Sequence, residues 1–123
     1  MNRKEVGDAG EARAAEWLAT RGYRVVCRQY RTQLGEIDLV CEEGTELVFV
    51  EVKTRRKSTR FGYPEETITR QKVLRLLKAG YAYLREHHMP DRAFRLEAVL
   101  VEGVPPKEII THISSLDAGV DAW

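Results

Sequence analysis

The sequence contains few cysteines, no long apolar run and almost no net charge. Its two cysteines, Cys27 and Cys41, stand in strand-like segments without a CxxC or Cys/His spacing, so we expect buried, reduced thiols and no zinc site. No stretch approaches the roughly 18 apolar residues that a membrane span needs. The first residues also lack the apolar core of a signal peptide. These absences predict a soluble, cytoplasmic protein that has no membrane partner.

The composition of the chain suits a single globular domain. Of its 123 residues, 43% are hydrophobic and 32% are charged, which allows one sizeable core but not two. No internal repeat or low-complexity tract interrupts the pattern. We therefore expect one domain over residues 1–123, in which residues 114–123 form a tail.

The charges are unevenly distributed, although the formal net charge is only +1. Residues 1–52 carry seven Lys or Arg against ten acids, whereas residues 53–78 carry nine against two. The positive stretch thus begins where the acidic stretch ends. A negative pocket beside a positive segment suits a metal site that receives a polyanion.

Hydrophobic periodicity and turn residues predict seven helices and strands. The helices are predicted over Val6–Thr20 and Glu65–Glu86, and the strands over Tyr23–Arg28, Glu36–Cys41, Leu47–Thr54, Ala93–Glu102 and Glu108–Ile113. This order, α-β-β-β-α-β-β, indicates an α/β fold in which helices flank a mixed central sheet.

The segment Gly35–Arg55 is predicted to be a β-hairpin, and it carries the most informative charged residues. Side chains alternate across a strand, so Glu51 and Lys53 share one largely apolar face. If Asp38 lies on that face of the neighbouring strand, an Asp, a Glu and a Lys meet there. Charges among apolar groups are costly unless they are paired or bound to a metal, so this cluster suggests chemistry.

The pattern of Asp38 followed by Glu51-Val52-Lys53 suits a divalent metal site. Two carboxylates and the main-chain carbonyl of Val52 supply the hard oxygen ligands that Mg²⁺ or Mn²⁺ prefers. Lys53 can position a water molecule or stabilise negative charge on a phosphate. The chemistry predicted is metal-dependent hydrolysis of a nucleic-acid backbone. A structural alternative is an ion pair between Glu51 and Lys53 on a partly exposed strand.

Glu11 has two interpretations. It lies at the edge of the small-residue stripe of the first helix, so its carboxylate could belong to the same site. It also follows Asp8 by three residues, as in a capping box, where an acid is favoured by the helix dipole. Sequence alone leaves both interpretations open.

The basic segment Arg55–Pro64 is a candidate nucleic-acid contact, because arginines and lysines surround the aromatic residues Phe61 and Tyr63. A solvated loop that packs its aromatic side chains onto the core explains the same residues. The predicted nucleic-acid contacts are Arg55, Arg56, Lys57, Arg60, Lys72 and Arg75.

Four motifs of the chain resemble the YraN family of small bacterial proteins, which are predicted endonucleases related to Holliday-junction resolvases. These motifs are GDAGEARAAEWL, GEIDLV, FVEVKTR and TRQK. The resemblance implies a restriction-endonuclease-like fold with a PD-(D/E)XK site. In that site Asp38 and Glu51 would be metal ligands, Lys53 the catalytic lysine and Glu11 a further acid. Glu36 and Gln71 would not bind the metal but would help to hold these residues in position.

The resemblance further implies a Mg²⁺-dependent endonuclease that acts on DNA, with branched or structured DNA among its substrates. Resolvases of this fold act as homodimers, because two strands must be cut symmetrically. The chain departs from the family pattern at Gln29, where Asn is usual, and at Arg95–Ala98. A nucleic-acid-binding or adaptor module, with weak or lost catalysis, is the alternative function.

Overall fold

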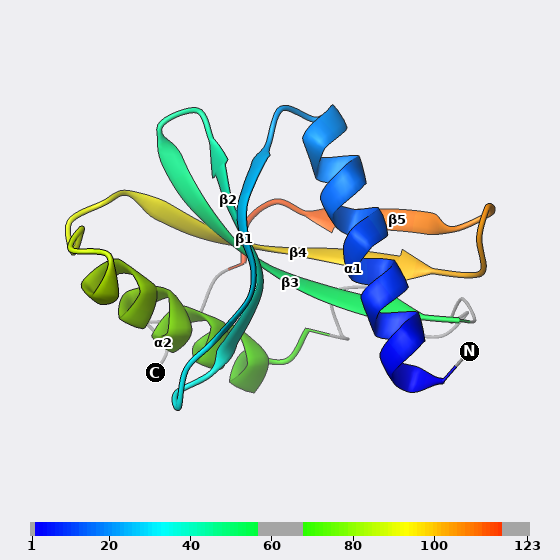
Figure 1. Cartoon of the computed structure of the whole chain (residues 1–123), viewed down its shortest axis with the longest axis horizontal. Coiled ribbons are helices and arrows are strands. Elements are labelled where there is room, and N and C mark those ends of the chain that lie inside the picture. Colours follow the sequence, from blue (N-terminus) through cyan, green and yellow to red (C-terminus); the bar gives the residue numbers. More distant parts are fainter. Residues whose placement is uncertain (1, 57–67, 117–123) are drawn as a thin grey trace.

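The computed structural model describes residues 2–56 and 68–116 as an α/β domain (Figure 1). Its elements follow the order predicted from the sequence. They are α1 (Arg3–Thr20), β1 (Arg24–Arg31), β2 (Glu36–Glu43), β3 (Glu46–Arg55), α2 (Arg70–Glu86), β4 (Phe94–Glu102) and β5 (Ile109–Ile113).

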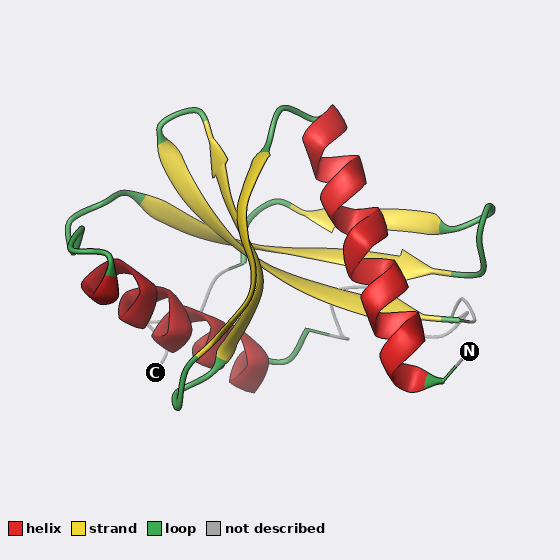
Figure 2. Ribbon diagram, viewed as in Figure 1, coloured by secondary structure: helices red, strands yellow, loops and turns green. Residues whose placement is uncertain are grey.

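The five strands form one mixed sheet in the order β1-β2-β3-β4-β5. Neighbouring strands are antiparallel except for β3 and β4, which are parallel and are connected through α2. The two helices pack against separate apolar clusters, one on each face of the sheet. Figure 2 shows α1 crossing in front of the strands, while α2 lies on the side of the sheet away from α1.

The hairpin formed by β2 and β3 has the alternation predicted from its sequence. Leu47 and Phe49 belong to the cluster beneath α2, whereas Val48 and Val50 belong to the cluster beneath α1. Main-chain pairing between the two strands runs from Glu43 and Glu46, beside the turn, to Leu39 and Val50. Beyond Leu39 and Val50 the main chains of β2 and β3 are no longer paired, which leaves room for side chains between the two strands.

Helix α1 begins three residues earlier than predicted. Asn2 is its N-cap, and the Asn2 side chain accepts a hydrogen bond of 2.8 Å from the Glu5 N–H. Glu11 therefore lies well beyond the first turn, and the capping interpretation of this residue is wrong. At Gly10 the helix lies so close to β3 that a Cβ atom would stand 2.6 Å from Thr54 Cγ2.

Helix α2 is capped by Thr69, whose hydroxyl accepts a hydrogen bond of 3.2 Å from the Lys72 N–H. The predicted start at Glu65 is too early for Ile68 and Thr69, which are not helical, and residues 65–67 lie outside the described part. Close packing recurs at Gly80, where an added Cβ would stand 2.7 Å from Phe49 Cδ2. The helix is thereby held tightly against the centre of the sheet.

A buried polar cluster on the α1 face joins β4, β5 and Tyr23, which directly precedes β1. The Glu97 side chain, fully buried, accepts hydrogen bonds from Tyr23 Oη at 2.8 Å and from Arg95 Nε at 2.7 Å. His112 Nε2 lies 2.7 Å from the same carboxylate. These contacts satisfy a charge that would otherwise be costly to bury, and they give His112 a structural role.

Both cysteines are free, as predicted, but only Cys41 is buried, whereas Cys27 is partly exposed. Burial raises the pKa of Cys41 to about 12. No helix among the described residues is long and apolar enough to cross a membrane. Leu116 anchors the start of the tail by donating its N–H to the Leu96 carbonyl at 2.8 Å. The remainder of the tail, residues 117–123, lies outside the described part.

Candidate active site

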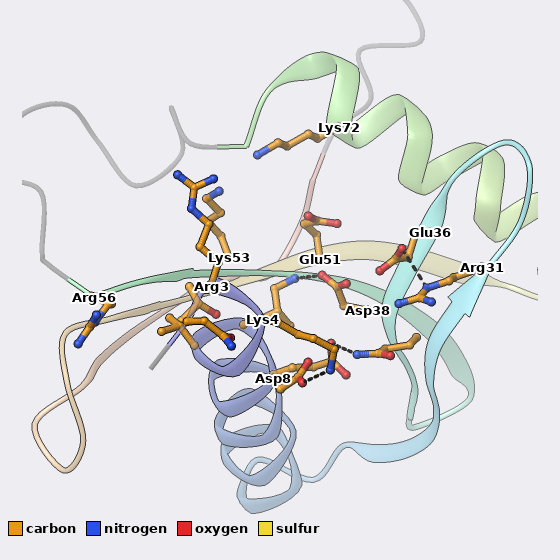
Figure 3. Close-up of a pocket in the computed structure, with 17 residues that line it drawn as sticks. Arg3, Lys4, Asp8, Arg31, Glu36, Asp38, Glu51, Lys53, Arg56 and Lys72 are labelled. Atoms are coloured by element: carbon orange, nitrogen blue, oxygen red, sulfur yellow. Dashed lines mark hydrogen bonds and ion pairs between the residues drawn. The ribbon is translucent and has the colours of Figure 1, made fainter.

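A cleft of about 700 Å³ opens where β2 and β3 cease to pair (Figure 3). It draws residues from both helices and from β1, β2 and β3. The acids and lysine predicted from the sequence all line it: Glu11, Glu36, Asp38, Glu51 and Lys53. The fold thus brings together side chains that stand far apart in the chain.

Asp38 replaces main-chain pairing at the point where the strands diverge. Its Oδ2 atom accepts a hydrogen bond of 2.7 Å from the Val52 N–H, which fixes the carboxylate between β2 and β3. Burial raises the pKa of Asp38 to about 6, and the nearby charges of Glu11 and Glu36 act in the same direction. The hydrogen bond from Val52 opposes this rise but does not cancel it.

Glu51 is the second carboxylate of the pair. Burial, followed by the charge of Asp38, raises the pKa of Glu51 to about 7, while Lys72 partly offsets the rise. Two carboxyl groups therefore share a partly desolvated cleft in which Asp38 disfavours ionisation of Glu51, while Glu11 and Glu36 disfavour ionisation of Asp38. Such a pair is stabilised when a cation enters between the groups or when one of them takes up a proton.

Lys53 lies two residues after Glu51, and Figure 3 shows both side chains on the side of β3 that faces Lys72. The Lys72 ammonium group lowers the pKa of Lys53, and burial and Arg55 lower it further. The charged amine of Lys53 is therefore less favoured than in water. A nearby anion, such as a phosphate, would stabilise the charged amine of Lys53.

Glu11 is buried, with a side chain that is 8% exposed, and it already has two polar partners. Its carboxylate accepts hydrogen bonds from Arg28 Nε at 3.2 Å and from Gln29 Nε2 at 3.4 Å. Gln29 makes its contact from the left-handed backbone region, at φ 53°. In this arrangement Glu11 contributes negative charge to the cleft while its oxygens are engaged by β1.

The supporting residues implied by the family resemblance occupy different places. Glu36 lines the cleft and pairs with Arg31 at 3.4 Å. Gln71 is exposed and is not among the lining residues, whereas Lys72 is. The supporting role of Gln71 stays a prediction, and Lys72 is the residue of α2 that reaches the cleft.

The predicted nucleic-acid contacts are divided between the cleft and other parts of the chain. Arg56 is exposed at the cleft, Arg55 lies on β3, and Arg75 lines an adjoining cleft beside α2. Lys57 and Arg60 lie outside the described residues. The binding roles of all six remain predictions.

Three further cations at the cleft, Arg31, Arg3 and Lys4, were not predicted. Arg3 and Lys4 lie eight and seven residues before Glu11 on the same helix, a spacing that places them towards the same helical face. This periodicity is the signal that could have found them. Their positive charges extend the basic rim to the N-terminal end of α1.

The oxygens available to a divalent cation come from Asp38, Glu51 and the Val52 carbonyl. Among residues 2–56 and 68–116, no three His, Cys, Asp or Glu side chains form a metal-binding group. Two mutually repelling carboxylates in an open cleft nevertheless fit Mg²⁺ or Mn²⁺, which bind through one or two carboxylates and keep several waters.

Comparisons with known proteins identify the family. A family profile described as "Uncharacterised protein family UPF0102" matches residues 10–101. A UPF0102 protein of Syntrophomonas wolfei is 47% identical over 115 residues, which cover 92% of this chain and 96% of the relative. A UPF0102 protein of Caldicellulosiruptor saccharolyticus is 41% identical over 101 residues, or 82% and 85% of the two chains. The chain therefore belongs to the UPF0102 family, the YraN family that its hairpin and helix motifs indicated.

Proposed function

We propose that this protein is a metal-dependent endonuclease that hydrolyses phosphodiester bonds in DNA. The observation that carries the proposal is the carboxylate pair of Asp38 and Glu51, which is held in an open cleft beside Lys53 and bordered by arginines and lysines. A protein that only bound nucleic acid would gain nothing from two acids where phosphates must approach.

The reaction adds water across one ester bond of the backbone. The water oxygen forms a bond to phosphorus while one phosphorus–oxygen ester bond breaks, which leaves a phosphate on one product and a hydroxyl on the other. Mg²⁺ or Mn²⁺, when bound, supplies positive charge that lowers the pKa of water and offsets charge on the phosphate. Asp38 and Glu51 would hold the cation, together with the Val52 carbonyl.

Lys53 is suited to hold the attacking water beside the phosphate. Its lowered pKa means that its neutral amine is reached more easily, so Nζ can also accept a proton from that water. In its charged form the same group stabilises the negative charge that develops in the transition state. Arg3, Lys4 and Arg56 at the cleft supply further positive charge for the backbone.

A binding module without catalysis is the second candidate, and one observation favours it. Among the described residues no three acids are grouped so as to hold a cation, and Glu11 is engaged by Arg28 and Gln29. Cation binding is then weak unless a phosphate completes the site. Weak binding would leave a protein that holds DNA without cutting it.

Cleavage assays with matched variants test the proposal. Linear duplex and four-way-junction DNA are incubated with the protein and Mg²⁺ or Mn²⁺, and products are resolved by gel electrophoresis. We expect Asp38→Asn and Lys53→Met to reduce cleavage by at least about 100-fold, the scale of losing one electrostatic contact to a transition state. Glu16→Gln removes an exposed acid on α1 and should cleave like the wild type.

Persistent cleavage by Asp38→Asn would show that the assigned site is wrong. DNA binding and cation binding without cleavage, under all conditions tested, would favour the binding module. Isothermal titration with Mn²⁺ supplies the cation measurement, and Glu51→Gln should abolish the heat of binding if the pair holds the ion.

A further inference from the structure

The carboxylate pair also faces a second cleft of about 670 Å³, on the side of the molecule nearer α2. This second cleft shares Arg31, Glu36, Asp38, Glu51 and Lys72 with the first. Its own lining comes from the β1–β2 turn, residues 32–35, and from α2 through Arg75 and Lys78. A strand that crosses the carboxylates can therefore continue on both sides of them.

The β1–β2 turn at this second cleft is fixed in place. Thr32 Oγ1 accepts hydrogen bonds of 3.0 Å from the N–H groups of Leu34 and Gly35, and the Thr32 N–H donates to the Gly35 carbonyl at 2.8 Å. Gly35 also approaches α2 closely, because a Cβ there would stand 2.5 Å from the Arg75 carbonyl oxygen. The turn is thus preorganised against the helix.

Leu34 projects an apolar side chain from this turn and is 53% exposed. Other large apolar side chains in the described part are equally exposed, but none of them lines either cleft: Val26, Tyr81, Val104 and Ile109. The cleft that Leu34 lines also carries the cations Arg31, Lys72, Arg75 and Lys78 beside the acids Glu36, Asp38 and Glu51. Cations at such a surface contact phosphates, whereas an apolar side chain contacts a base.

We infer that Leu34 packs against an unstacked base of the bound strand and so favours DNA with an unpaired nucleotide close to the cleaved bond. This inference rests on the proposed function and names the substrate class. Apolar side chains such as leucine can enter between bases, and unstacking costs least where a base lacks a partner. A rigid turn suits this role, because little conformational entropy is lost when the base arrives.

Binding measurements in the Glu51→Gln background test the inference without cleavage. The probes are short duplexes with 2-aminopurine beside a single unpaired nucleotide, together with fully paired duplexes of the same sequence. We expect the parent to prefer the bulged duplex and to increase 2-aminopurine fluorescence. Adding Leu34→Ser should remove most of that increase and weaken binding of the bulged duplex about tenfold, equivalent to 1.4 kcal/mol. Binding of the paired duplex should change less than about twofold.

Two control variants accompany the comparison of the parent with Leu34→Ser. Leu34→Met keeps an apolar side chain and should behave like the parent, whereas Ile109→Ser removes an exposed apolar side chain from β5, away from both clefts. Ile109→Ser should leave both the preference and the fluorescence unchanged. Because Leu34 is exposed, thermal melting should show that Leu34→Ser folds like the parent.

The inference is overturned if Leu34→Ser keeps both the preference and the fluorescence increase, or if the parent shows neither while binding DNA. In both cases the proposed endonuclease function is not contradicted, because DNA is still bound and cleavage is tested separately. If the parent binds no DNA of any form, the proposed function fails and the inference falls with it.

Discussion

Asp38 and Glu51 determine how the stability of the metal-free protein depends on pH. Their pKa values of about 6 and about 7 lie above the ordinary values of 3.8 and 4.5. Between the ordinary and the raised pKa of each group, the folded state binds more protons than the unfolded state. The free energy of unfolding therefore falls as the pH rises through this range. The proposed site is therefore a source of instability at neutral pH, which a bound cation would relieve.

Replacing Glu51 by glutamine should stabilise the metal-free protein at pH 8 by about 1–3 kcal/mol, since one pKa unit corresponds to about 1.4 kcal/mol. At pH 4.5 the difference should be much smaller, because Glu51 is then protonated in the folded wild type. Urea unfolding at the two pH values measures the effect. Glu16→Gln is the control, and an equal gain from both variants would contradict the assignment to the carboxylate pair.

Without a cation, Glu51→Gln is expected to be more stable than the wild type, and Mg²⁺ should reverse this order. A ligand that binds only the folded state stabilises it by RT ln(1 + [L]/Kd), about 2.7 kcal/mol at 100 times the Kd. We expect the wild type to gain melting temperature as Mg²⁺ or Mn²⁺ is added, while Glu51→Gln and Asp38→Asn do not. Equal gains in all three proteins would place cation binding elsewhere.

Gln29 adopts the left-handed region at φ 53°, where asparagine is better tolerated. Asparagine is also the residue that the family resemblance places there. We expect Gln29→Asn to increase the free energy of unfolding by about 0.5–1 kcal/mol, because left-handed backbone costs most residues about 1–2 kcal/mol. A loss of stability would mean that the 3.4 Å contact with Glu11 outweighs the backbone preference.

At the scale of elements, α1 is positioned by its contact with β3. Gly7 and Gly10 lie one turn apart on this helix, but an added Cβ meets nothing within 4 Å at Gly7 and meets Thr54 at Gly10. Substitution by alanine should therefore change the stability of the protein in opposite directions at the two positions. This contact also sets the depth of Glu11, which follows Gly10 directly.

We expect Gly10→Ala to destabilise the protein by about 1–3 kcal/mol, as overpacking does, and to reduce cleavage by displacing α1 from β3. Gly7→Ala should stabilise it by about 0.5–1 kcal/mol, because alanine favours a helix interior over glycine. Thermal and urea unfolding measure both changes. If the two variants behave alike, α1 does not pack on β3 as described.

Helices and strands were predictable from the sequence wherever a local residue pattern indicated them. Alternation predicted the two faces of the β2–β3 hairpin, and helical periodicity predicted helix α2. The start of α1 was missed because its cap, Asn2, precedes a charged first turn with no apolar periodicity. The Glu11 capping interpretation failed for the same reason.

The finer features of the cleft depend on tertiary packing and were not predictable. No pattern indicates that the Asp38 carboxylate accepts the Val52 N–H or that Glu97 is buried with three polar partners. Gly35 and Arg75, which both line the second cleft, approach each other closely although they stand far apart in the sequence. Sequence therefore predicts which residues carry the chemistry better than it predicts the path of a substrate.

At the scale of the whole molecule, positive charge lies on both sides of an acidic centre. Binding of DNA should therefore weaken steeply as salt increases, because each neutralised phosphate releases counterions. Arg75→Gln should lower the magnitude of the slope of log K against log salt by about one. Arg85→Gln, an exposed arginine on α2 that lines neither cleft, is the matched control and should leave the slope unchanged.

The parallel pairing of β3 with β4 also has a kinetic consequence. Asp38 and Glu51 lie on strands joined by a tight turn, whereas β4 reaches β3 only after the chain has passed through α2. Closing the long connection costs more entropy, so we expect the hairpin to form first during folding. The acids then meet before the sheet is complete, and their repulsion opposes an early step. Removing either charge should therefore accelerate folding and change the unfolding rate much less.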